Sequence, residues 1–245
     1  VYHQTKDLTL YSDTVYTLTG LFFIDSTVTL TIQPGTVIKG DTAATLIIYR
    51  GGKIMANGTA AQPIVFTSNK PAGSRLPGDW GGIIILGEAP TNQVNPLIEG
   101  GIIPGSYGGS NPNDNSGIMR YVRIEYPGYR FQLDNEVNGL TCGGVGRGTT
   151  LEYIQVSYAD DDAYEFFGGT VDAKHIVAFG GTDDVFDTDF GYQGRIQFGF
   201  ALRDPNYDDP TGQSNGWESD NEGSASYNTP RTHPIYSNIT MIGPG

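Results

Sequence analysis

Short runs of alternating apolar and polar residues shape the first third of the chain. Four runs between residues 27 and 68 each have the length of one β-strand. They are Thr27–Ile32, Thr36–Ile38, Leu46–Tyr49 and Ile64–Thr67. Turn dipeptides such as Pro-Gly, Gly-Gly and Asn-Gly separate the runs. Because this spacing is too short for helical crossovers, the pattern predicts an all-β protein.

These strands fit either antiparallel hairpins or a coil of parallel strands. Each run ends at a corner rather than in the two-residue loop that closes a hairpin, which favours the coil. We therefore predict a right-handed parallel β-helix, with the handedness that parallel crossovers normally take. At roughly 20 to 25 residues per rung, the chain would make about ten rungs.

Two internal repeats support stacked rungs. Residues 161–169 align with residues 183–191 at an offset of 22, and residues 121–126 align with residues 153–158 at an offset of 32. The first offset fits one rung and the second fits one rung plus a loop. We predict one β-helix domain over residues 1–245, with polar loop inserts at about 97–117 and 203–232.

The composition agrees with this fold and narrows the choice of partners. The chain has 35 glycines and 14 prolines but only 14 lysines and arginines together, which disfavours long exposed helices. A formal net charge of −13 repels nucleic acid and anionic lipid, and no apolar run is long enough to span a membrane. The single cysteine, Cys142, cannot form an internal disulfide. Cations, neutral sugars and other proteins remain as partners.

An acidic segment is the sharpest chemical signal. Residues 160–189 hold nine carboxylates and one lysine. The 22-residue register stacks Asp161 on Asp183 and Glu165 on Asp187, and like charges opposite each other across strands are destabilising. We therefore predict a calcium site, because Ca²⁺ accepts about six to eight oxygen ligands in loose geometry. Its predicted ligands are Asp161, Glu165, Asp183, Asp187 and Asp189. A solvated acidic surface without a bound ion is the alternative.

Two aromatic side chains are candidates for stacking on sugar rings. Trp217 lies in the polar insert at 203–232, and Tyr192 follows the acidic segment. The apolar face of such a ring can stack on a sugar ring, and the polar N–H or O–H group can hydrogen-bond to it. The alternative for Trp217 is that it anchors its own loop on the rod.

Paired carboxylates also permit an enzyme, either a polysaccharide lyase or a glycoside hydrolase that acts on an acidic glycan. In this alternative, Lys174 or Arg195 is the base beside the acidic face. The β-helical polygalacturonases carry a Gly-His-Gly and an Arg-Ile-Lys element, and the sequence has neither. These observations favour a protein without enzymatic activity.

Several segments resemble secreted right-handed β-helix proteins of Bacteroidota. The resemblance rests on residues 30–68, Gly78–Gly87, Tyr121–Tyr126, Glu165–Val171, Gly181–Asp184 and Phe186–Gly191. It implies an exported protein, often a cargo of type IX secretion, at the cell surface or in an extracellular matrix. On this basis we expect a structural or adhesive rod that binds calcium, contacts polysaccharide and associates with neighbouring copies of itself.

Overall fold

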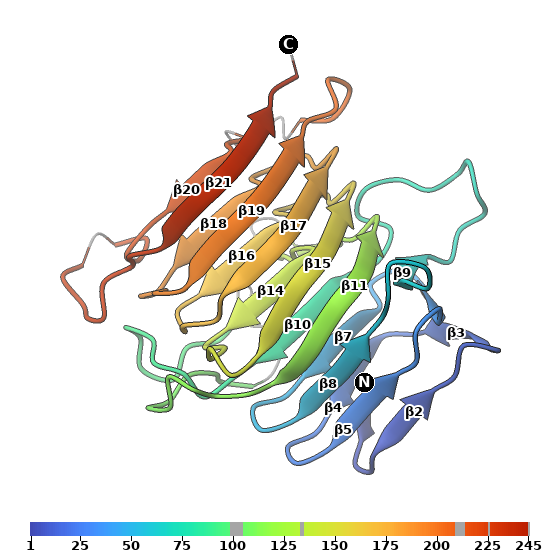
Figure 1. Cartoon of the computed structure of the whole chain (residues 1–245), viewed down its shortest axis with the longest axis horizontal. Coiled ribbons are helices and arrows are strands. Elements are labelled where there is room, and N and C mark those ends of the chain that lie inside the picture. Colours follow the sequence, from blue (N-terminus) through green and yellow to red (C-terminus); the bar gives the residue numbers. More distant parts are fainter. Residues whose placement is uncertain (99–104, 133–134, 209–213, 225, 245) are drawn as a thin grey trace.

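The protein is a right-handed parallel β-helix, as the sequence predicts (Figure 1). The computed structural model describes residues 1–98, 105–132, 135–208, 214–224 and 226–244. These residues form strands, turns and bends, with no helix among them. Consequently the described part of the chain offers no helix with the length and apolar character needed to cross a membrane.

Two large sheets form the walls of the coil. Eight strands make the first, called sheet A: β1 (Tyr2–Gln4), β4 (Leu21–Ile24), β7 (Thr45–Ile48), β10 (Gly82–Leu86), β14 (Leu140–Gly143), β16 (Tyr164–Phe167), β18 (Phe186–Asp189) and β20 (Trp217–Ser219). Eleven strands make the second, called sheet B: β2 (Leu8–Leu10), β3 (Val15–Leu18), β5 (Thr29–Ile32), β6 (Val37–Gly40), β8 (Lys53–Asn57), β9 (Ile64–Ser68), β11 (Gly117–Glu125), β15 (Thr150–Ser157), β17 (Ala173–Phe179), β19 (Arg195–Leu202) and β21 (Ile235–Ile242). A separate antiparallel pair joins β12 (Arg130–Gln132) to β13 (Asn135–Glu136).

Sheet B changes its construction along the coil. The first three rungs each give it two short strands, whereas β11 pairs with both β8 and β9 and continues as one long strand. Each long strand turns at one residue with a left-handed backbone, which in β21 is Asn238, with φ of 55°. In β11, β15, β17 and β19 this residue is aromatic: Tyr121, Tyr153, His175 and Phe198, with φ of 49°, 55°, 53° and 60°. We call these four side chains the aromatic ladder.

The strand pairing confirms both repeats found in the sequence. Tyr164 pairs with Phe186 across the 22-residue offset, and Val122 pairs with Ile154 across the 32-residue offset. Within the described residues sheet A has eight strands, so this part of the chain forms fewer rungs than the ten predicted. The difference arises because long segments leave the coil, the longest of them between β10 and β11. That segment contains nearly all of the predicted insert at 97–117.

The second predicted insert needs a correction. Residues 203–232 include β20, which pairs in parallel with β18 and therefore belongs to the coil. The strand is only three residues long and two of them are polar, so its sequence lacks the alternation that marks the longer strands. Only the remainder of this segment lies outside the two sheets in the described residues.

Apolar side chains fill the inside of the coil and also cover part of its outside. The interior forms one continuous cluster that runs from Leu18 to Ala201 and includes Cys142. A second cluster lies on the outer face of sheet A, where Phe23, Ile47 and Ile84 pack under side chains of the segment that follows β10. That outer cluster marks the boundary of the candidate site.

Candidate functional site

One line of outward side chains runs along sheet A and changes character midway. Strand pairing places these residues in successive rungs: His3, Phe23, Ile47, Ile84, Thr141, Glu165, Asp187 and Glu218. We call this line the outer column. Its first half is aromatic and aliphatic, whereas its last three members are carboxylic acids. The predicted stacking of Glu165 on Asp187 is confirmed by this register.

A tight group of three carboxyls surrounds the middle of the acidic half. One oxygen each from Asp162, Glu165 and Asp187 lie within 4.8 Å of one another. Glu165 is only 4% exposed, and the side-chain amide of Asn138 donates a hydrogen bond to it. Oδ1 of Asp187 is buried and has no hydrogen-bond partner among the described residues. A buried carboxylate oxygen without a partner is costly, and it is a free ligand for a cation.

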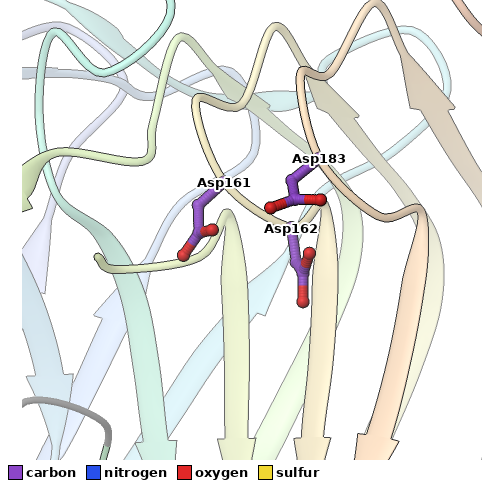
Figure 2. Close-up of side chains that lie close together, drawn as sticks. All are labelled: Asp161, Asp162 and Asp183. Carbon is purple, nitrogen blue, oxygen red and sulfur yellow. The ribbon is translucent and has the colours of Figure 1, made fainter. Parts of the chain in front are cut away.

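A second group lies at the corner that leads into sheet A. Figure 2 shows Asp161, Asp162 and Asp183 close together, where the chain enters β16 and β18. One oxygen from each lies within 4.8 Å of the others, so Asp162 belongs to both groups. Asp162 also accepts a hydrogen bond of 3.0 Å from the backbone N–H of Asp184. This bond between rungs fixes Asp162 at the junction of the two groups.

The surroundings of these carboxyls disfavour their ionised form and raise their pKa values. Burial, followed by the nearby Asp161, raises the pKa of Asp162 well above its ordinary value. Burial raises the pKa of Asp187 to about 7. A hydrogen bond with Asp184 and then burial raise the pKa of Glu218 to about 7. Loss of water penalises the ionised form in each case, and neighbouring carboxylates add to the penalty. A bound divalent cation would remove that penalty.

The predicted ligand set and the observed groups overlap but differ at two positions. Asp161, Glu165, Asp183 and Asp187 each belong to a group, whereas Asp189 belongs to neither. Asp189 lies at the end of β18 and accepts a hydrogen bond from the N–H of Phe190, and burial raises its pKa to about 6. Sequence reasoning missed Asp162, because alternation carried back from Tyr164 assigns it to the inward face. The corner breaks that alternation, although the repeated Asp-Asp doublet was a visible signal.

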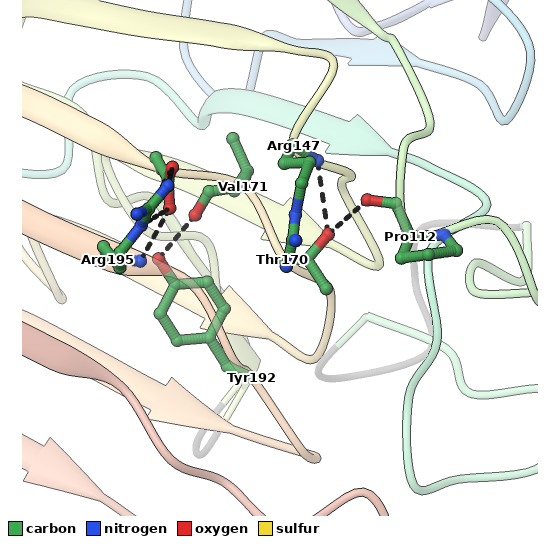
Figure 3. Close-up of polar contacts among 7 residues, drawn as sticks. Pro112, Arg147, Thr170, Val171, Tyr192 and Arg195 are labelled. Carbon is green, nitrogen blue, oxygen red and sulfur yellow. Dashed lines mark hydrogen bonds and ion pairs between the residues drawn. The ribbon is translucent and has the colours of Figure 1, made fainter.

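The structure corrects the prediction that Tyr192 stacks on sugar rings. Tyr192 is fully buried and stacks on Phe166 with the ring centroids 4.8 Å apart. Its hydroxyl donates a 2.8 Å hydrogen bond to the carbonyl of Val171 (Figure 3). No face of this ring is open to a ligand, so Tyr192 is a core residue.

Trp217 occupies a different place from the one predicted. It lies on β20 in register with the inward-facing Phe186, rather than in a polar loop. The residue is 42% exposed, and its ring meets Tyr236 edge-on, with the centroids 5.8 Å apart. The side chain therefore continues the inner column of sheet A, and its role in carbohydrate binding stays a prediction.

The two bases proposed for a lyase lie away from the acidic column. Lys174 is on β17 of sheet B, in register with Glu152. Arg195 begins β19 of the same sheet and forms a 2.5 Å ion pair with Asp172 (Figure 3). Arg203 is closer to the acidic corner, and its guanidinium donates hydrogen bonds to the carbonyls of Thr182 and Asp183. The described residues therefore do not bring either predicted base together with the three-carboxyl groups.

Comparison with known protein families supports the parallel β-helix fold. The family model described as a pectate-lyase-like β-helix domain matches residues 2–245. No match was found among curated proteins or among solved structures. The matched region covers almost the whole sequence, and its parallel rungs are the architecture that the family description names. The chain therefore belongs to the pectate-lyase-like β-helix domain family.

Proposed function

We propose that this protein is an exported, non-enzymatic β-helix that binds calcium on sheet A and contacts acidic polysaccharide through the bound ion. Asp162, Glu165 and Asp187 hold the ion, and Asp161 and Asp183 extend the site to the corner. The observation that carries this proposal is the buried, unpartnered Oδ1 of Asp187 within a group of three carboxyls.

Calcium fits this set of donors better than other common ions. Both groups offer carboxylate oxygens and contain no histidine or cysteine, which disfavours zinc and copper. Magnesium requires near-ideal octahedral geometry and keeps much of its water, whereas calcium tolerates irregular shells of about six to eight oxygens. Three carboxyls leave coordination positions that water or a ligand must fill. A carboxylate of an acidic glycan is a suitable oxygen donor for those positions.

Two further observations support a polysaccharide partner outside the cell. The family description refers to pectate lyase, which names a class of protein that acts on an acidic plant polysaccharide. The acidic surface and the resemblance to secreted Bacteroidota proteins support export and a structural or adhesive role. Association with neighbouring copies belongs to the same proposal.

Hydrolysis of an acidic glycan is a second candidate function, and one observation favours it. Burial keeps the pKa of Asp187 near neutrality, which suits a general acid. The positions of Lys174 and Arg195 on sheet B weigh against the lyase form of this alternative. Release of reducing ends or of unsaturated sugars from polygalacturonate would establish an enzyme in place of a binding protein.

The calcium proposal is tested by thermal unfolding and by titration calorimetry, with calcium chloride or with excess EGTA. Binding to the folded state at about 100 times the dissociation constant adds about 2.7 kcal/mol of stability. For a chain of this size, that gain raises Tm by roughly 5 to 10 °C. The double variant Glu165→Gln/Asp187→Asn should lose the shift, because it removes two of the charged ligands.

The matched control is Asp13→Asn, which removes a carboxylate from an exposed position near the other end of the chain. This variant should keep the full calcium response. A Tm that does not change between calcium and EGTA, or a shift that survives in Glu165→Gln/Asp187→Asn, would refute binding at this site.

A further inference from the structure

The aromatic ladder forms a continuous ridge on the outside of sheet B. Tyr121 and Tyr153 stack with their ring centroids 4.5 Å apart, and Tyr153 and His175 stack at the same distance. Phe198 continues the stack at 4.8 Å from His175. The ring planes differ by at most 13°, so the four rings follow the axis of the coil from rung to rung. Tyr153 and Phe198 remain 39% and 44% exposed.

The ridge is not part of the hydrophobic core. The residues next to the ladder, such as Val122, Ile154 and Ile176, point inward and are fully buried. A left-handed backbone at a bulky residue costs free energy, and here it recurs in four consecutive rungs. Stacking offsets part of that cost. Asn238 adopts the same backbone at the matching position of β21, so the bend itself belongs to the fold. The line of stacked, partly exposed rings at the other four positions is what the core does not require, and it points to a role at the surface.

The strands that carry the ladder are basic in an otherwise acidic protein. Strands β11, β15, β17 and β19 hold four bases, Arg120, Arg123, Lys174 and Arg195, against two acids, Glu125 and Glu152. The net charge of the whole chain is −13. By contrast, β16, β18 and β20 of sheet A hold four acids and no base.

Two of these bases are available to a ligand. Arg120 is paired with Glu152, and Arg195 is paired with Asp172. Arg123 and Lys174 are both exposed, and neither has an ion pair or hydrogen bond within the described ranges. Arg123 lies two residues after a ladder position on its strand and Lys174 one residue before, so the free charges flank the ridge on both sides.

We propose that the aromatic ladder, with Arg123 and Lys174, is a second glycan-binding surface, which holds an extended anionic polysaccharide along the coil axis without a bridging cation. Ring edges contact the apolar C–H groups of the sugars, and the two bases pair with carboxylate or sulfate groups. The hydroxyls of Tyr121 and Tyr153 hydrogen-bond to sugar hydroxyls. A repeat of about 4.8 Å between rungs presents these groups in a line, which suits a linear polymer.

The charge pattern favours a polysaccharide over other polyanions. Nucleic acid has a dense line of phosphates and depends on many basic contacts, whereas this chain has two free bases on the ridge and a strongly negative remainder. A uronate chain has fewer charges for its length and more hydroxyl and C–H surface for the rings. The acidic half of sheet A on a second copy is the competing occupant, and the experiment below separates it.

The surface is tested with polygalacturonate in excess EGTA, a condition that removes any calcium-dependent contact on sheet A. We expect the wild-type protein to retain binding in affinity electrophoresis and titration calorimetry. The double variant Arg123→Glu/Lys174→Glu should bind about tenfold or more weakly, because two charge pairs are reversed. Phe198→Ser should weaken binding several-fold with no change in its salt dependence. The control Lys53→Glu reverses an exposed charge on β8, away from the ladder, and should change affinity less than twofold.

The possible results are distinct. If EGTA abolishes all binding in the wild type, or if Arg123→Glu/Lys174→Glu binds as tightly as Lys53→Glu, the ladder is not a glycan site. If light scattering shows self-association that this double variant abolishes, the ridge serves a second copy and the proposal is overturned. Glu165→Gln/Asp187→Asn should keep the EGTA-resistant binding, so failure of the calcium site and failure of the ladder are separately visible. Circular dichroism and Tm establish that each variant is folded.

Discussion

The outer column of sheet A passes through two contrasting environments on one continuous backbone. Phe23, Ile47 and Ile84 are fully buried under the segment that follows β10, where Ile98 and Tyr107 pack over them. Two rungs after Ile84 the same column consists of carboxyls, and the pKa values of Asp187 and Glu218 are raised by their surroundings. Strand pairing is parallel in both halves, so the backbone does not distinguish them. What covers the sheet decides whether a position is part of the core or part of a ligand site.

The largest expected effect comes from introducing a carboxyl into the apolar half of the outer column. Ile84→Asp buries an unpaired carboxyl at a position with no exposure, beneath apolar side chains. We expect a loss of more than about 4 kcal/mol, or no folded protein, because nothing there compensates a buried charge. Ile84→Val should cost only about 0.5 to 1.5 kcal/mol. Urea unfolding measures both, and near-native stability of Ile84→Asp would show that the covering segment opens easily.

The second-largest expected effect is the pH dependence of folding stability without calcium, which should come from the acidic half of the outer column. The pKa of Asp187 and of Glu218 is about 7 in the folded state, above the ordinary values of 3.8 and 4.5. The folded state therefore holds more protons than the unfolded state, and stability falls as pH rises from about 4 to 7 and then levels off. Tm should decrease through this window in EGTA and decrease less in saturating calcium. In Asp187→Asn, the slope should be smaller, and an unchanged slope would contradict the assignment.

Tyr192→Phe tests whether the interior behind the acidic half is packed like the rest of the core. The change removes a buried hydroxyl that donates a 2.8 Å hydrogen bond to the Val171 carbonyl. We expect a loss of about 1 kcal/mol in urea unfolding. Affinity for polygalacturonate should not change, because the ring is inaccessible. Reduced affinity in a protein of normal stability would restore Tyr192 as a carbohydrate residue.

The smallest expected effect comes from removing one charge from the acidic half. In EGTA, Asp187→Asn should stabilise the protein by about 0.5 to 1 kcal/mol, because it removes a buried charge and relieves repulsion from Glu218 in the next rung and from Asp189. In calcium the order should reverse, since the variant lacks a ligand. Urea titrations under both conditions measure this reversal. If wild type and variant are equally stable in EGTA and also in calcium, Asp187 is ordinary acidic surface.

The features that sequence predicts well are those that depend on nearest neighbours. The register of Glu165 on Asp187 follows from a local 22-residue repeat, because two rungs of similar sequence pair at equivalent positions of the repeat. Asp162 was missed because alternation holds along a strand and ends at a corner. The burial of Tyr192 and the cover over Ile84 depend on segments that return from elsewhere in the chain. A local pattern contains no information about such contacts.

The regular step between rungs also bears on how such a chain can lengthen in evolution. Tyr164 to Phe186 on sheet A and Leu151 to Ala173 on sheet B are both offsets of 22 residues. A tandem duplication of one such unit in the gene would add one strand to each wall and one inward row to the interior. The same event would add one carboxyl to the acidic line and one ring to the ridge. Length and both surfaces would therefore be inherited together, and selection for a longer rod would multiply its ligand contacts in proportion.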